Sequence, residues 1–241
     1  MDNQQGNPLH IMDDYFEPLA YAIGAMTGDG TLGEYGPAIN VHIRCMDIDC
    51  VQRVKHEIDS FFGVDYRFYS YTNPNGTLMY GYNASNPLVY DLFKYFIGEK
   101  LVIRDEVFRA SRDARLNFLA GLFDTDGYIA EQEHPGAKYG YSWRVGFASR
   151  HKTFVEDVAR LLQKLGVKVG KVHEQVSGFS RTIYVIKPNI RSFVSAGCYF
   201  QIPRKAKRLR HYVEAVEPSE TIMPHPQRRG EDIVRQKVKA Y

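Results

Sequence analysis

Two aspartates occupy matching positions in a nine-residue repeat. Residues 22–30 read Ala-Ile-Gly-Ala-Met-Thr-Gly-Asp-Gly, and residues 119–127 read Leu-Ala-Gly-Leu-Phe-Asp-Thr-Asp-Gly. Each copy has a glycine at its third position and ends in Asp-Gly, which places Asp29 and Asp126 97 residues apart. A repeat at this spacing predicts two similar halves that each contribute one helix and one carboxylate.

Both aspartates are predicted at helix C-termini, where the negative end of the helix dipole disfavours a carboxylate by roughly 0.3–1 kcal/mol. If the two helices pack side by side, repulsion between the like charges adds to this cost. A divalent cation offsets both effects, and carboxylates with helix-end carbonyls, here those of Gly28 and Thr125, are ligands that Mg²⁺ accepts. Mn²⁺ or Ca²⁺ is expected to occupy the same sites. Such a pair suits metal-assisted hydrolysis of two phosphodiesters.

Small residues are predicted to bring the two motif helices together. Gly24 and Gly28 are four residues apart and therefore share a helix face, and Gly121 and Thr125 hold the same positions in the second copy. This pattern alone is also typical of a buried helix with no chemical role, and Asp-Gly is a common helix stop. Two copies followed by the same order of elements favour the functional interpretation.

Hydrophobic spacing predicts the order helix-strand-strand-helix-strand-strand-helix in each half. Strands that follow one another without an intervening helix indicate an α+β fold with antiparallel sheets. We expect a helix from about Glu17 to Asp29 and a second-half strand over 167–175. The predicted segments are an N-terminal tail at 1–16, a first half at 17–100, a linker at 101–112, a second half at 113–200 and a basic C-terminal extension at 201–241.

Bulk properties are those of a globular intracellular protein. Hydrophobic residues make up 44% of the 241 residues, the three cysteines form no CxxC pair, and the first residues lack a signal-peptide pattern. Residues 1–100 contain 6 Lys and Arg against 13 Asp and Glu, so the positive charge lies in the rest of the chain. We expect a monomer in the cytoplasm, or in an organelle of a eukaryote, with a polyanionic partner and no membrane partner.

The second motif closely resembles the signature of the LAGLIDADG homing endonucleases, with Phe123 for Ile and Thr125 for Ala. The first copy is looser, and the two copies together resemble the single-chain members of the family. The resemblance implies two αββαββα halves, with motif helices packed at their interface and saddle-shaped sheets over the DNA major groove. It also implies that Asp29 and Asp126 bind metal and direct a double-strand break with 3′ overhangs. Asp124 has no acidic counterpart in the first copy and is not assigned to the metal.

The family also places a basic side chain near the end of the second strand of each half, close to the cleaved phosphate. Strand phasing offers Arg44 and Arg150 as candidates. The family usually has Lys here, and Arg can stabilise charge but is a poor proton donor. The alternative is that both are surface arginines ahead of a helix.

A sheet that faces a duplex should carry polar, basic and aromatic residues at alternate positions. The residues that fit this pattern are Asn40, His42, Arg67, Tyr69 and Tyr71 in the first half and Arg144, Lys171, His173 and Arg181 in the second. For the tyrosines, packing within a hairpin is the competing interpretation. The C-terminal extension either clamps phosphates outside the saddle or is a solvated tail.

Three functions remain open from the sequence. The leading one is a site-specific endonuclease acting on a long, pseudo-palindromic or asymmetric DNA target. The second is a binding protein on the same scaffold, such as an RNA maturase or a regulator, and the third is a degenerate endonuclease that still binds DNA. The sequence does not reveal the target or whether the gene lies in an intron, in an intein or alone.

Overall fold

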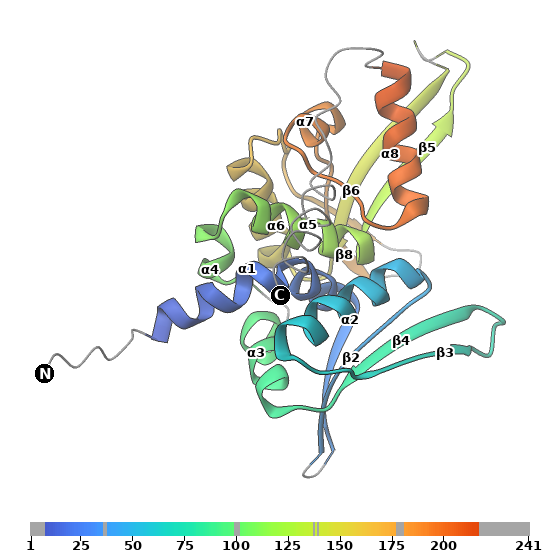
Figure 1. Cartoon of the computed structure of the whole chain (residues 1–241). Coiled ribbons are helices and arrows are strands. Elements are labelled where there is room, and N and C mark those ends of the chain that lie inside the picture. The colour runs from blue at the N-terminus through green and yellow to red at the C-terminus, as the bar shows by residue number, and fades with distance from the viewer. Residues whose placement is uncertain are drawn as a thin grey trace, which may run out of the picture.

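The computed structural model describes residues 8–35, 38–98, 102–136, 138, 140–176 and 181–216. Its elements repeat in the predicted order (Figure 1). The first half comprises α1 (Pro8–Asp29), β1 (Gly30–Tyr35), β2 (Ala38–Cys45), α2 (Ile48–Phe62), β3 (Arg67–Thr72), β4 (Leu78–Ala84) and α3 (Pro87–Ile97). The second half comprises α5 (Arg112–Thr125), β5 (Gly127–Glu133), β6 (Tyr141–Ser149), α6 (Lys152–Lys164), β7 (His173–Val176), β8 (Thr182–Ile186) and α7 (Ile190–Ser195). A short α4 (Asp105–Arg109) joins them, and α8 (Pro203–Val216) follows.

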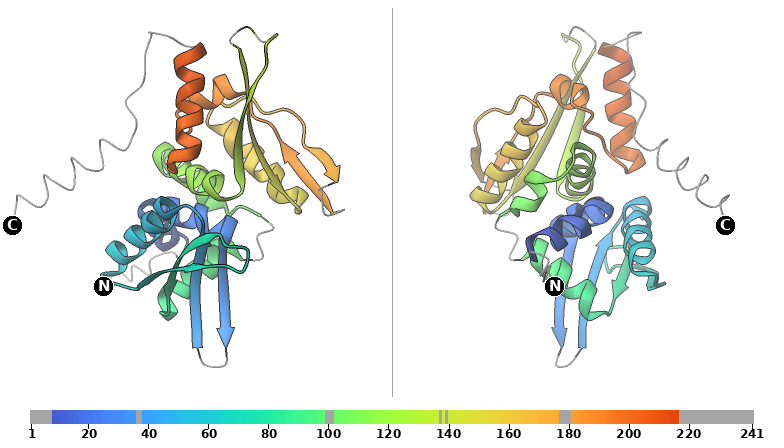
Figure 2. Two further views of the ribbon diagram at one scale, coloured as in Figure 1. Left: turned by 90° about the vertical axis from the view of Figure 1, so that its right-hand side faces the viewer. Right: turned by 60° about the vertical axis from the view of Figure 1, so that its left-hand side comes forward.

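Each half contains one four-stranded antiparallel sheet. The strand orders, β1-β2-β4-β3 and β5-β6-β8-β7, are equivalent in the two halves. The prediction of two αββαββα halves with antiparallel sheets is therefore confirmed. The sheets lie toward one side of the molecule, and α1, α3, α4 and α6 lie toward the other (Figures 1 and 2).

Amphipathic helices cover the inner faces of the sheets. In α2, Val51, Val54 and Ile58 are buried at helical spacing, and Gly63 ends the helix with a left-handed φ of 64° that glycine adopts without strain. The halves share one core, because the ring of Phe16 on α1 lies 6.0 Å from that of Phe118 on α5. Among the described residues, no helix is long and apolar enough to cross a membrane.

Three local predictions differ from the structure. Helix α1 begins at Pro8, not near Glu17, so residues 8–16 do not form a tail; Pro8 is suited to a first helical position. Strand β7 starts only at His173, because Val169 makes an isolated bridge to Pro188, which lacks an N–H to continue a ladder. The polar linker contains helix α4. Residues 217–241, with the second basic cluster of the extension, lie outside the described residues.

Helix α8 packs against the long β5–β6 hairpin on the face that belongs to the core. His211 on α8 contacts Glu131, and the ring of Tyr212 meets that of Trp143 at 5.6 Å. Glu34, which holds the place of Glu131 in the first repeat, instead pairs with Lys94 of α3 at 3.0 Å. Helix α8 thus contacts the second hairpin at the position where α3 contacts the first. The second-half equivalent of α3, α7, is only six residues long.

Candidate active site and nucleic-acid interface

The motif helices α1 and α5 touch backbone to backbone. A Cβ atom on Gly24 would overlap the carbonyl oxygen of Phe118, and one on Gly121 would lie 2.7 Å from the backbone nitrogen of Ala25. Any larger side chain would force the helices apart. The predicted role of these two glycines in close helix packing is borne out.

The same pairing continues to the ends of the motifs. A Cβ atom on Gly28 would lie 2.7 Å from Cβ of Thr125 and 3.4 Å from Cγ of Asp126. Asp29 is the last residue of α1, Asp126 caps α5, and both side chains are exposed. The two carboxylate-bearing helix ends therefore lie together at the interface between the halves. Thr125 directs its hydroxyl inward, donating to the carbonyls of Gly121 at 3.2 Å and Leu122 at 3.0 Å.

Asp124 lies inside the protein. Its carboxylate accepts hydrogen bonds from the Tyr21 hydroxyl at 2.8 Å and from the backbone N–H groups of Gln201 and Ile202 at 3.0 and 3.4 Å. Burial raises the pKa of Asp124 to about 6. Thr27, at the matching place in the first motif, donates to the carbonyl of Ile23. The sixth motif position is thus structural in both copies.

The donor set at the helix ends fits a hard divalent cation, because it consists of two exposed carboxylates and neighbouring backbone carbonyls. Among the described residues, no group of three or more His, Cys, Asp and Glu side chains converges elsewhere to compete with it. The residues that could hold a cation here are Asp29 and Asp126, with the carbonyls of Gly28 and Thr125. Oxygen atoms of a bound phosphate would complete such a site.

In the first half, the strand register brings the predicted contact residues onto one face. Arg44 of β2 lies opposite Gly81 of β4, which lies opposite Tyr69 of β3, and His42 is aligned with Arg67 through Asn83 in the same way. Asn40 and Tyr71 share this face by alternation, and the buried Val41 and Ile43 point to the core.

These side chains form an aromatic and basic cluster. The Arg44 Nε atom donates to the Tyr69 hydroxyl at 3.3 Å, and its guanidinium lies 5.9 Å from the centre of the Tyr71 ring. The rings of Tyr69 and Tyr71 are stacked, and Arg67 lies 5.4 Å from the Tyr69 ring centre. A Cβ atom on Gly81 would lie 2.7 Å from Cε2 of Tyr69, so Gly81 makes room for that ring.

Electrostatics keep Arg44 charged and His42 neutral. The hydrogen bond to Tyr69 raises the pKa of the Arg44 guanidinium. Partial burial and the neighbouring Arg44 lower the pKa of His42, whose Nδ1 lies 3.0 Å from Oδ1 of Asn40. Arg44 can therefore stabilise an anion, and His42 can offer a neutral hydrogen-bonding edge.

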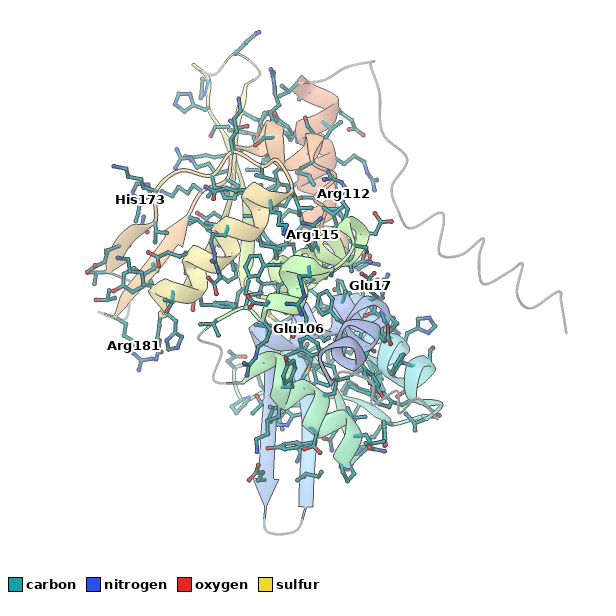
Figure 3. The ribbon with its side chains drawn as sticks, turned by 90° about the vertical axis from the view of Figure 1, so that its left-hand side faces the viewer. Glu17, Glu106, Arg112, Arg115, His173 and Arg181 are labelled. Atoms are coloured by element: carbon teal, nitrogen blue, oxygen red, sulfur yellow. The ribbon has the colours of Figure 1, made fainter. Side chains whose placement is uncertain are left out.

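In the second half, the equivalent sheet face does not repeat the basic and aromatic cluster of the first. Gly30 pairs with Ile43 in the first half, and Gly127 pairs with Phe147 in the second. The residue equivalent to Arg44 is therefore Ala148. Arg150 lies two residues beyond that position. Arg144 faces outward from β6 and is exposed, and His173 occupies the place of Tyr69. Lys171 lies just before β7 and is exposed. His173 and Arg181 lie at the outer edge of this sheet (Figure 3).

Two residues at the start of α8 contact groups that no local sequence pattern predicts. The Nζ atom of Lys205 donates to the carbonyls of Phe123, Asp124 and Gly127 at 2.8, 2.7 and 2.6 Å. Arg204 forms a bidentate ion pair with Asp47 of the first half, with Nε to Oδ1 and Nη2 to Oδ2 both at 2.8 Å. The basic composition of the extension was the only signal, and it predicted a solvent or phosphate contact.

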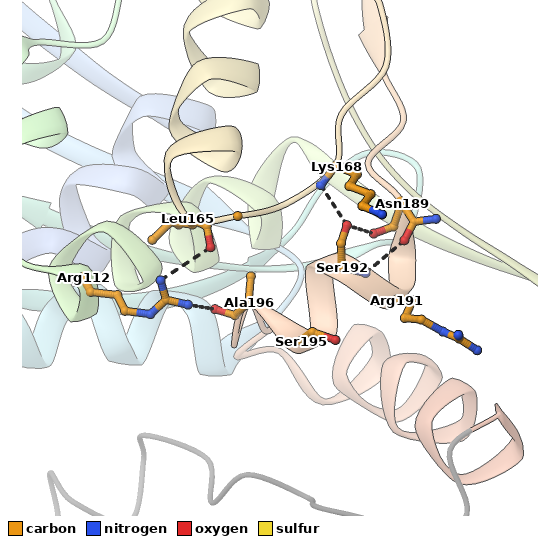
Figure 4. Close-up of a pocket in the computed structure, with 9 residues that line it drawn as sticks. Arg112, Leu165, Lys168, Asn189, Arg191, Ser192, Ser195 and Ala196 are labelled. Atoms are coloured by element: carbon orange, nitrogen blue, oxygen red, sulfur yellow. Dashed lines mark hydrogen bonds between the residues drawn. The ribbon is translucent and has the colours of Figure 1, made fainter.

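A surface hollow lies between α6 and α7 (Figure 4). Arg112 spans one side of it, with its guanidinium donating to the carbonyls of Leu165 at 3.5 Å and Ala196 at 2.7 Å. Ser192 connects the backbone of Lys168 to Asn189 on the other side. These contacts tie helix ends together, which is a structural role.

The second half is similar to a known protein family. The family model described as "LAGLIDADG-like domain" matches residues 113–202, which span α5 and the whole second sheet. The match lies in the half that carries the clearer of the two motifs.

Solved structures of LAGLIDADG homing endonucleases share the whole fold. The homing endonuclease I-DmoI in complex with DNA and Ca superposes with a TM-score of 0.55 at 17% identity, covering 81% of this chain and 98% of that one. The homing endonuclease I-WcaI bound to its DNA recognition sequence gives a TM-score of 0.52 at 14% identity, covering 86% and 94%. I-DmoI has also been solved in complex with DNA and Mn, with a TM-score of 0.52. At these identities the likeness shows that the chain has the two-half LAGLIDADG fold.

The curated relatives are much longer than this chain. The ribonucleoside-diphosphate reductase NrdEB subunit alpha of Bacillus subtilis (strain 168) is 26% identical over 170 residues, and the corresponding subunit of Bacillus phage SPbeta matches equally. The alignment covers 62% of this chain but spans only 14% of the length of those relatives.

Proposed function

We propose that the chain is a site-specific DNA endonuclease that hydrolyses one phosphodiester on each strand of a duplex with a divalent metal ion, leaving 3′ overhangs. The observation that carries the proposal is the juxtaposition of Gly28, Thr125 and Asp126 at the paired ends of α1 and α5. It places two helix ends, each with an exposed carboxylate and one from each half, side by side.

Asp29 and Asp126 hold the metal in this proposal, with the carbonyls of Gly28 and Thr125. The bound cation, proposed to be Mg²⁺, supplies an activated water and neutralises charge that develops on the phosphate. Arg44 lies on the sheet face next to this site and stabilises phosphate charge without transferring a proton, because its guanidinium stays protonated. Arg150 remains the proposed counterpart in the second half, offset by two positions.

The outer faces of the two sheets bind the duplex in this proposal. Arg67, Arg144, Lys171 and Arg181 supply positive charge, which contributes the salt-dependent part of the affinity. Asn40, His42 and the tyrosines offer hydrogen bonds and apolar contacts to base edges. The halves present different side chains at equivalent places, such as Tyr69 and His173, so an asymmetric target site fits better than a perfect palindrome.

Several aspects of the biological setting belong to the same proposal. The enzyme acts as an intracellular monomer, since one chain supplies both motifs, and it mobilises an intron or intein that carries its gene. A reductase activity is not proposed, because the match to the reductase subunit spans only 14% of that protein. The flanking genomic DNA tests the setting, since a homing site normally spans the insertion point of its element.

Selection from a library of randomised DNA duplexes tests the activity. The wild-type chain with Mg²⁺ is expected to cut a defined subset of sites on both strands. Specific binding of a duplex in Ca²⁺ with no cleavage in Mg²⁺ or Mn²⁺ would favour the binding-protein alternative. The geometry does not favour that alternative, because both carboxylates are retained, exposed and at neighbouring helix ends.

A further inference from the structure

Lys205 places a buried ammonium group at the C-terminal end of the second motif helix. Its residue is only 4% exposed, and its Nζ atom donates to the carbonyls of Phe123, Asp124 and Gly127 at 2.6 to 2.8 Å. A protonated amine has three N–H donors, so these three carbonyls satisfy it completely. Lys205 is therefore a built-in cap for α5, supplied by a residue that lies about 80 positions away.

The three acceptors lie on both sides of Asp126. The carbonyls of Phe123 and Asp124 belong to the last turn of α5, whose carbonyls lack partners within the helix, and Gly127 begins β5. A cation at this end also opposes the negative pole of the helix dipole. One ammonium group thus ties the peptide unit between Asp124 and Thr125 to the one between Gly127 and Tyr128, and Asp126 lies between these two units.

The first turn of α8 is itself held from both halves. Arg204 pairs with Asp47, which follows β2 of the first half, and the carboxylate of Asp124 accepts the backbone N–H groups of Gln201 and Ile202. Adjacent residues of α8 therefore connect the first half to the end of α5. A small displacement of Lys205 would therefore shift the backbone on either side of Asp126.

We propose that Lys205 is a positioning residue for Asp126, and that the Arg204–Asp47 ion pair holds Lys205 in place. The proposal deepens the proposed endonuclease function and rests on it for its kinetic consequence. Because the three carbonyls that accept from Lys205 all belong to the second motif, its loss should disturb the carboxylate of one half and leave that of the other in place. The expected signature is an imbalance between cleavage of the two DNA strands.

The kinetic experiment compares Lys205→Met with wild type on a duplex that wild type selects and cuts. Methionine keeps an apolar stem of similar length and removes the cation. We expect cleavage of one strand to slow at least 10-fold more than cleavage of the other, so that nicked duplex accumulates, while affinity for the duplex in Ca²⁺ changes less than 3-fold. The proposal would be overturned if the substitution left both strand rates unchanged or lowered both by the same factor.

Lys207→Met is the matched control, because Lys207 is an exposed lysine on the same helix and the substitution removes the same charge. It should preserve the wild-type ratio of the two strand rates. If Lys205→Met does not fold, Lys205→Gln keeps two N–H donors for the carbonyls without the positive charge and carries the same comparison.

Amide hydrogen exchange tests the positioning claim without any cleavage. In the Lys205 variant, exchange at residues 126–128 should accelerate at least 10-fold, and exchange at residues 29–31 should stay unchanged. Unchanged exchange at 126–128, or equal acceleration at both places, would overturn the proposal. A wild-type chain that cuts no duplex would refute the proposed function, and hydrogen exchange would still decide the role of Lys205.

Discussion

Gly28 lies directly against Thr125 across the interface of the two halves: a Cβ atom on Gly28 would be 2.7 Å from Cβ of Thr125. The two residues precede Asp29 and Asp126 in their motifs, so the packing of helix backbones determines where the carboxylates lie. The proposed cleavage site therefore depends on the size of side chains at the helix interface several residues away from the two carboxylates.

The packing of α1 on α5 predicts a large effect for Gly121→Ala. The added Cβ would lie 2.7 Å from the Ala25 nitrogen and would also overlap the Tyr21 carbonyl oxygen, both rigid backbone atoms. We expect the free energy of unfolding to fall by about 2–4 kcal/mol, measured by urea denaturation.

Gly170→Ala is the control for that substitution, because nothing lies within 4 Å of a Cβ at Gly170. It should change the free energy of unfolding by less than about 1 kcal/mol. A Gly121→Ala protein as stable as the Gly170→Ala protein would contradict the close helix contact.

The buried Asp124 predicts a pH-dependent stability. Burial raises its pKa to about 6, whereas an unfolded aspartate titrates near 3.9, so the folded chain binds this proton more tightly. The associated stabilisation is complete below about pH 4 and is lost as the pH rises through 6. Between pH 7 and pH 5, wild type should gain about 1 kcal/mol in free energy of unfolding relative to Asp124→Asn. A difference between the two proteins that stays constant across this range would show that Asp124 titrates normally.

Charge on the outer sheet faces predicts the salt dependence of DNA binding. Arg144→Ala or Lys171→Ala should each reduce the slope of log affinity against log salt concentration by about 1, because each removes one phosphate contact. Lys152 is the control, since it lies on α6 and pairs with Glu156 on that helix. Fluorescence anisotropy with a selected duplex in Ca²⁺ measures the slopes. If Lys152→Ala reduced the slope as much as the sheet variants, DNA would not bind the sheet face.

The sequence predicts the repeated parts of the molecule well because they follow local rules. Glycines at helical spacing indicated the contact of α1 with α5, and alternation in β2 placed Asn40, His42 and Arg44 on one face. Asp124 is left out of the metal site because Thr27, which is not acidic, holds the matching position in the first motif. Each of these inferences needed only the periodicity of a helix or strand and the comparison of two motifs.

The remaining features depend on contacts between distant residues. Lys205 reaches carbonyls about 80 residues earlier, and no periodic pattern distinguishes it from the exposed Lys207 two positions later. Arg150 shares the alternation of Arg144, but only the pairing of Gly127 with Phe147 reveals that Ala148 holds the position of Arg44. Register and long-range capping are properties of the assembled chain. Basic composition alone predicted contacts of the extension with solvent or phosphate, whereas Arg204 binds Asp47 and Lys205 binds backbone carbonyls.

Asp29 and Asp126 together form the proposed cleavage site. Asp29→Asn combined with Asp126→Asn keeps the size of both side chains and removes both charges. On a duplex that wild type cuts in Mg²⁺, the double variant should bind with affinity in Ca²⁺ within about 3-fold of wild type. Its cleavage rate on both strands should fall at least about 1,000-fold, the loss expected when groups essential to catalysis are removed. Cleavage of that duplex by the double variant at a rate near that of wild type would contradict the account.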